Sequence, residues 1–169
     1  MKLLLIPILL LSASGAGAAN TNSDHPNEGP AAFARLKTLV GEWEADTKMG
    51  KAHLTYELIA GGSALVERET MGDTPPMMTV YYLDGNRLLL THYCMVGNQP
   101  RMQARRFDAA SGELVFEFLD ATNLASPRAG HMHSAKMRLS DNNHFTSEWD
   151  FYDNGERKST ETGQYTRVR

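Results

Sequence analysis

The stretch GEWEADTKM, residues 41–49, alternates between two kinds of side chain at every second position. One kind is apolar or small and the other is acidic: Trp43, Ala45 and Thr47 against Glu42, Glu44 and Asp46. Successive side chains of a β-strand point to opposite faces, so this period of two predicts a strand with one buried face. Residues 41–49 therefore indicate that the chain enters a sheet here.

The same period returns along the rest of the chain, divided by turn residues such as Asp84-Gly85-Asn86 and Asn154-Gly155. The strands are predicted near residues 41–49, 52–60, 64–71, 77–83, 87–95, 101–108, 112–119, 131–139, 144–152 and 157–168. Consecutive short strands joined mostly by hairpins favour an all-β fold, a single antiparallel up-and-down barrel of about ten strands. Closing the sheet also removes its exposed edges.

One short helix is predicted before the first strand, over residues 30–40. Pro30 suits a first helical turn, Phe33, Leu36 and Val40 share one face, and Gly41 ends the helix. The helix leads into one end of the barrel, where it is expected to act as a plug.

The first 19 residues have the pattern of a secretory signal peptide. Lys2 precedes an apolar run, and Ala16-Gly17-Ala18 fits the small-residue cleavage pattern. The polar residues 20–29 are expected to be a flexible lead-in, and residues 30–169 the barrel domain. We therefore expect a secreted or periplasmic protein with no membrane insertion after signal cleavage.

Charge gives no support for a nucleic-acid partner. The chain has 17 Lys and Arg against 20 Asp and Glu, a formal net charge of −3, and no basic block. Cys94 is the only cysteine, so no intrachain disulfide can form.

The stretch LKTLVGEWEA, residues 36–45, resembles the start of the lipocalin and calycin superfamily, which includes fatty-acid-binding proteins and nitrobindin-like haem barrels. The shared features are a short helix followed by Gly41-x-Trp43 on the first strand. The resemblance implies that a basic residue of the last strand, Arg167 or Arg169, covers Trp43. Ten strands fit the fatty-acid-binding and nitrobindin-like barrels better than the eight of lipocalins. The stretches THYCMVGNQPRM and GHMHSAKMRL are also similar to exported bacterial calycin-like proteins of uncharacterised function.

The end of the barrel opposite the helix is predicted to be its mouth. In an up-and-down barrel the longest loops, residues 96–100 and 121–130, lie at this same end. Barrel mouths and loops on rigid scaffolds are common ligand sites. We therefore expect a small apolar or amphipathic molecule to enter between these loops.

Two strands bring polar side chains to the predicted mouth. His92 and Cys94 end one strand, while His131 and His133 begin another on the face that also carries Ala135. Arg101 is expected to pair a ligand carboxylate, and neighbouring amides to bind its polar head. The predicted ligand-binding residues are His92, Cys94, Asn98, Gln99, Arg101, His131, His133 and Tyr81.

Other interpretations of the same residues remain open. His131 and His133 with His92 or Cys94 form a possible ligand set for zinc or copper, in a metal-binding protein or a metal-dependent enzyme. An inward histidine in an apolar barrel is also compatible with haem. Cys94 and His92 lack a third orienting group, which argues against nucleophilic catalysis. A barrel filled by its own side chains would be a scaffold without a ligand.

Overall fold

The computed structural model describes residues 28–168, which fold into two short helical segments, a ten-stranded barrel and a further helical turn between two strands. The helices are α1 (Glu28–Leu36), η1 (Lys37–Leu39) and η2 (Ala60–Gly62). The strands are β1 (Gly41–Thr47), β2 (Gly50–Ile59), β3 (Ala64–Met71), β4 (Met77–Asp84), β5 (Arg87–Tyr93), β6 (Gln99–Asp108), β7 (Glu113–Thr122), β8 (His131–Leu139), β9 (His144–Asp153) and β10 (Glu156–Arg167).

The strands form a closed antiparallel barrel in sequence order, with β1 pairing β10 to complete the circle. This confirms the predicted all-β, ten-stranded up-and-down barrel with a helix before its first strand. Hairpin turns make this order possible. In the β9–β10 turn Asn154 and Gly155 have φ of 55° and 79°, the left-handed conformation that tight hairpins need and that Asn and Gly favour.

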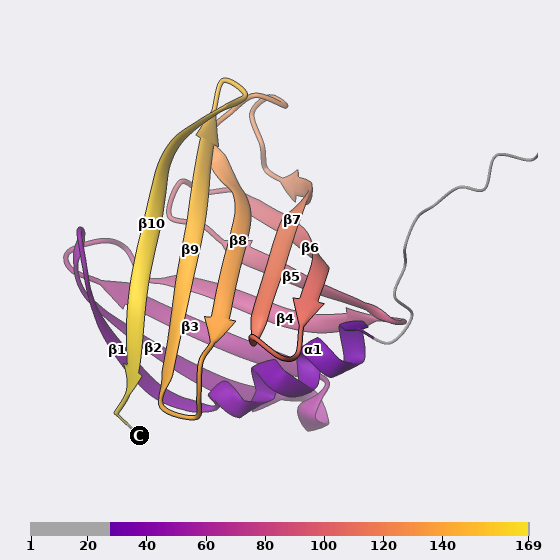
Figure 1. Ribbon diagram of the computed structural model, residues 1–169. Coiled ribbons are helices and arrows are strands. Elements are labelled where there is room, and N and C mark those ends of the chain that lie inside the picture. Colours follow the sequence, from indigo (N-terminus) through magenta and orange to yellow (C-terminus); the bar gives the residue numbers. More distant parts are fainter. Residues whose placement is uncertain (1–27, 169) are drawn as a thin grey trace, which may run out of the picture.

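Helix α1 lies across the end of the barrel where β1 begins and β10 ends (Figure 1). Its buried face carries Ala32, Phe33 and Leu36. Arg35 Nη2 donates to the Leu139 carbonyl oxygen at 2.8 Å, and Gly29 lies directly against the Asn86 carbonyl in the β4–β5 turn. The helix begins two residues earlier than expected, so Pro30 still falls in its first turn.

The helix end of the barrel is filled by side chains. Trp43 is fully buried and donates from Nε1 to the Leu39 carbonyl oxygen at 2.7 Å. The Arg167 guanidinium lies 4.2 Å from the Trp43 ring centroid and donates to the carbonyl oxygens of Thr38, Val40 and Asn142. Arg167 is therefore the basic residue that covers Trp43, one of the two residues expected to do so.

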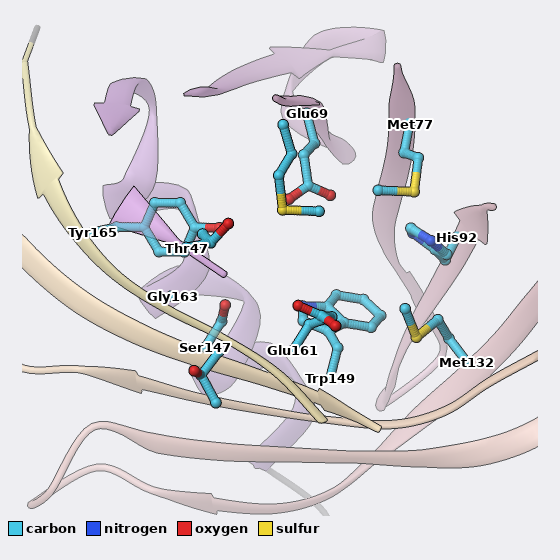
Figure 2. A pocket seen from close by; sticks show the side chains of 12 residues that line it. Thr47, Glu69, Met77, His92, Met132, Ser147, Trp149, Glu161, Gly163 and Tyr165 are labelled. Carbon is cyan, nitrogen blue, oxygen red and sulfur yellow. The ribbon is translucent and has the colours of Figure 1, made fainter. Parts of the chain in front are cut away.

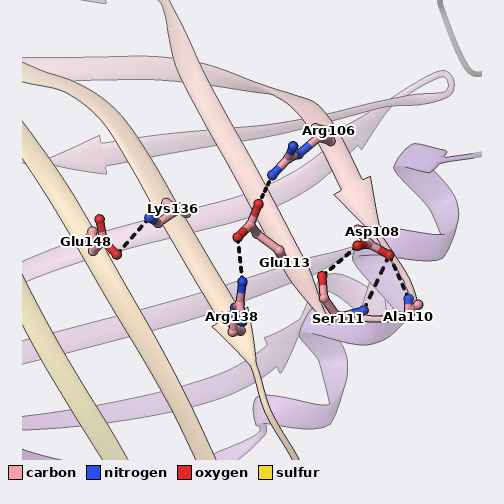
Figure 3. A network of polar contacts seen from close by, with 8 residues as sticks. All are labelled: Arg106, Asp108, Ala110, Ser111, Glu113, Lys136, Arg138 and Glu148. Carbon is pink, nitrogen blue, oxygen red and sulfur yellow. Dashed lines mark hydrogen bonds and ion pairs between the residues drawn. The ribbon is translucent and has the colours of Figure 1, made fainter.

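The outer surface of β6 to β9 is polar and carries ion pairs (Figure 3). Glu113 pairs with both Arg106 and Arg138, and Lys136 Nζ lies 2.8 Å from a carboxylate oxygen of Glu148. These pairs join neighbouring strands across the outside of the barrel. A ligand site is therefore to be sought in the interior of the barrel.

No helix within residues 28–168 is long and apolar enough to cross a membrane. The predicted signal peptide and most of the predicted lead-in lie outside the described residues, so both stay predictions.

Candidate functional site

A pocket opens inside the barrel at the end opposite α1, where β1, β3 and β5 end and β8 begins (Figure 2). It lies at the predicted mouth. Its apolar lining combines thioethers and one indole, from Met71, Met77, Met132 and Trp149. Its polar and small lining comes from Thr47, Glu69, His92, Ser147, Glu161, Thr162, Gly163 and Tyr165.

The pocket is narrow. It encloses about 420 Å³ of empty space, part of which is solvent at the opening, so the enclosed core of the pocket is small. That core volume has room for a few water molecules or a slim organic group. The helix half of the barrel is packed with Trp43, Phe116 and Met137, which are fully buried. A haem-sized ligand does not fit this space.

His92 projects from β5 into the pocket and is 3% exposed. Its Nδ1 lies 3.0 Å from the Thr79 hydroxyl on β4, while its buried Nε2 has no hydrogen-bond partner. The imidazole lies 5.1 Å from the Trp149 ring, centroid to centroid. Burial lowers the pKa of His92 to about 4, so the ring is neutral at neutral pH.

Two carboxyl groups line opposite walls of the same pocket, Glu69 on β3 and Glu161 on β10 (Figure 2). Burial, reinforced by the nearby Glu67 and Glu161 carboxyls, raises the pKa of Glu69 to about 8. The Oε2 atom of Glu161 is buried without a hydrogen-bond partner. The lining residues include no lysine and no arginine.

A third acid lies deeper in the barrel. Glu67 is buried and accepts a hydrogen bond from the Tyr81 hydroxyl at 2.8 Å. Burial raises the pKa of the Glu67 carboxyl, and burial beside Glu67 raises the pKa of Tyr81. Tyr81 thus points inward, as expected, but it belongs to the packed core and does not line the pocket.

Cys94 is buried just beyond the end of β5, outside the pocket lining. Burial raises the pKa of its thiol, which favours the unreactive protonated form. Its backbone N–H donates to the Asn98 carbonyl oxygen at 3.1 Å. The residue therefore closes the β5–β6 loop.

Asn98 and Gln99 join loops at the mouth and do not line the pocket. The Asn98 Nδ2 donates to the Gly130 carbonyl oxygen at 2.7 Å, which ties the β5–β6 loop to the β7–β8 loop. The Gln99 Oε1 accepts from the Thr122 hydroxyl at 2.7 Å. Both amides therefore shape the opening that a ligand would pass.

Arg101 is paired within the protein. Its Nε donates to Asp120 Oδ1 at 2.6 Å, and Nη2 contacts the second carboxylate oxygen, so the pair is bidentate. Arg101 and Asp120 face each other across β6 and β7, away from the pocket lining. Its geometry gives no support to the expected pairing with a ligand carboxylate.

His131 and His133 form a small cluster of rings with Phe118 and Tyr152 at the mouth. Their imidazoles are joined by a contact of 3.0 Å from His131 Nε2 to His133 Nδ1, and His133 stacks on Tyr152 at 4.3 Å. Burial lowers the pKa of His133, and the nearby His131 lowers it further by a smaller amount. The cluster lies beside the pocket and not in its lining.

A register shift in β8 explains why the two histidines do not line the pocket. The pairing with β9 slips between Met132 and Ser134, so the strict alternation that put both histidines on the face of Ala135 is interrupted. Met132 lines the pocket in their place. Within residues 28–168 no three or more His, Cys, Asp or Glu side chains are grouped to hold a metal ion.

The sequence reasoning missed Glu69 and Glu161, although a signal for Glu69 was present. Leu65, Glu67, Glu69 and Met71 share one face of β3 by the period of two, and Leu65 and Met71 are buried. Burying an acidic side chain on an apolar face costs folding free energy. Such acids are therefore candidates for a functional site. Glu161 had no such signal, because β10 is polar on both faces near it.

No protein-family model matches the sequence, and no curated protein matches it. A solved structure of a protein of unknown function from the DUF3598 family of Nostoc punctiforme PCC 73102 resembles the barrel, with a TM-score of 0.54 and 15% sequence identity. The match covers 79% of this chain and 49% of that one, so this chain spans about half the length of that protein. At this identity the likeness shows a shared fold alone.

Proposed function

We propose that this protein is an exported, calycin-like binding barrel that holds a small amphipathic molecule in the mouth pocket. The observation that carries the proposal is the pair of unpartnered buried polar atoms, His92 Nε2 and Glu161 Oε2, in the lining of one pocket. A buried polar atom without a partner costs free energy, about 1–3 kcal/mol, which a bound ligand would recover.

The rest of the lining suits the apolar part of such a molecule. Trp149 offers a flat apolar face, and methionine side chains adapt to different shapes. The Arg167–Trp43 contact supports the calycin-like assignment, because it is the contact that the resemblance implies. The sequence pattern of residues 1–19 supports export.

Binding has better support than catalysis. The raised pKa of Cys94 disfavours a thiolate nucleophile, and this thiol does not line the pocket. The metal alternative has less support than an organic ligand, since His92 lies in the pocket whereas His131 and His133 contact each other outside its lining. The alternative of a filled scaffold without a ligand agrees with the packed helix half of the barrel. It does not account for the polar pocket at the other end.

The first test is native mass spectrometry of the processed protein, purified from its own host without chelator and without a metal column. The expected result is a complex heavier than the polypeptide by one small organic mass. The variant Trp149→Ala should lose that mass, and the control Glu148→Gln, next to it on the outer face, should keep it. A stoichiometric metal without an organic mass, or a bare polypeptide in every preparation, would contradict the proposal.

A further inference from the structure

We infer that the ligand carries an organic cation, a primary alkylammonium group, bound between Glu69, Glu161 and Nε2 of His92. The inference rests on the proposed function and adds the chemical class of the ligand head. An ammonium group has three N–H donors, and the pocket offers acceptor atoms on three strands, β3, β5 and β10.

Charge selects a cation over an anion. Glu69 and Glu161 face the same narrow space, and the lining contributes no lysine or arginine to balance them. Glu69 is mostly protonated below its pKa of about 8, and a bound cation would favour its ionised form, whereas a ligand carboxylate would find no basic side chain in the lining to pair with. Arg101, the residue that would have favoured an anion, is occupied by Asp120 in a bidentate pair. The pocket therefore favours the opposite charge from the one that the sequence suggested.

His92 supplies the observation that is independent of the acids. Its side chain is almost fully buried and lines the pocket, and its Nε2 has no hydrogen-bond partner. When Nδ1 carries the proton and donates to Thr79, Nε2 is left as an acceptor. A neutral imidazole held in this way can accept an N–H hydrogen bond from a cation, and it carries no positive charge that would repel the cation.

The remaining lining matches an alkylammonium with a short chain. Trp149 stands next to His92 and can contact a cation with its ring face. Met77 and Met132 lie on either side of His92 in Figure 2 and provide apolar contact for methylene groups. The narrow core of the pocket favours a slim chain over a branched or aromatic one.

The test uses three probes of equal chain length and different head group: butylammonium chloride, sodium butyrate and 1-butanol. Binding to the processed protein is measured by isothermal titration calorimetry at constant ionic strength and pH 7.5. We expect butylammonium to bind with a dissociation constant at least about tenfold lower than that of butanol, and butyrate to bind more weakly than butanol.

Substitutions then locate the cation. Glu161→Gln and Glu69→Gln keep the shape of the side chain, and each should weaken butylammonium binding by about tenfold while leaving butanol binding unchanged. Glu156→Gln removes an exposed acid from the same strand as Glu161 and should change neither. Far-ultraviolet circular dichroism confirms that each variant is folded, and either glutamate variant suffices if the other does not fold.

The outcomes separate this inference from the proposed function. If butanol or butyrate binds and butylammonium does not, the pocket binds ligands but the cation inference is wrong. If none of the probes binds, both are wrong. If silver ion raises the melting temperature and butylammonium does not, the thioethers and His92 form a soft-metal site, which also overturns the inference.

Discussion

Glu69 makes the stability of the barrel depend on pH. Its unfolded carboxyl loses a proton near pH 4.5, and the folded one near pH 8, so between these values the folded protein binds more protons. The free energy of unfolding therefore falls as pH rises through this window. Glu69→Gln removes this loss. Relative to the wild type it should gain about 1 kcal/mol between pH 6.5 and pH 8.5, less than the full linkage of about 2 kcal/mol because the pocket opens to water.

Urea unfolding at several pH values measures this difference. Glu156→Gln is the control, because Glu156 is exposed and its difference from the wild type should be flat over the same range. His92 does not disturb the comparison, since its folded and unfolded pKa values contribute equally to the wild type and to the variant and cancel in the difference. A Glu69→Gln difference that stays constant with pH would show that Glu69 is ionised in the folded protein.

Arg167 stabilises the closed end of the barrel through its shape as well as its charge. It donates to three carbonyl oxygens from two segments and covers the Trp43 ring. Arg167→Ala should lower the free energy of unfolding by about 1–2 kcal/mol, because three carbonyl groups of exposed residues lose donors and the Trp43 ring loses its cation contact. Arg167→Lys should recover less than half of this loss, since an ammonium cannot reproduce the guanidinium fork.

The matched control for Arg167 is Arg105→Ala, which removes an exposed arginine of β6. It should change the free energy of unfolding by less than about 0.5 kcal/mol. Equal effects of the two alanine variants, measured by urea unfolding, would mean that the contacts of Arg167 add nothing beyond a surface charge.

At the scale of elements, the packing of α1 against the end of the barrel depends on the absence of a side chain at Gly29. A Cβ on Gly29 would overlap the Asn86 carbonyl oxygen in the β4–β5 turn. Although alanine is the better helix former, Gly29→Ala should lower the melting temperature by several degrees, about 5 °C, because the helix must move away from the turn. Ala31→Ser, at an exposed position of the same helix, should have little effect; a stabilised Gly29→Ala variant would contradict this account.

Elements were more predictable from the sequence than the site was. The hydrophobic period located all ten strands, because burial of one face leaves its mark on every second residue. The same period failed at β8, where the slip between Met132 and Ser134 depends on pairing with β9. The sequence also carried no sign of the Arg101–Asp120 ion pair, since Asp120 lies on the next strand and no local pattern reveals that pairing.

At the scale of the molecule, the strands form one closed barrel in which two pairings, β5–β6 and β1–β10, are short seams that divide it into two halves, β1 to β5 and β6 to β10. Within the described residues β5 pairs β6 only from Leu89 to Thr91, whereas β9 and β10 pair along most of their length. Backbone amides at the β5–β6 and β1–β10 seams should therefore exchange with deuterium faster than those of β9. Hydrogen exchange followed by mass spectrometry measures this, and uniform protection around the barrel would show that the seams are not weak.

The pocket is lined by residues of both halves of the barrel, so a bound ligand would contact both halves. Glu69 and His92 come from the half formed by β1 to β5, while Trp149 and Glu161 come from the half formed by β6 to β10. A cation that binds both sides should stabilise the closed arrangement in proportion to its affinity. Saturating butylammonium is therefore expected to slow amide exchange in β3 and β10 together, and to do so less in Glu161→Gln than in the wild type. Slowed exchange in one half of the barrel alone would indicate a ligand that binds one wall of the pocket and leaves the seams unaffected.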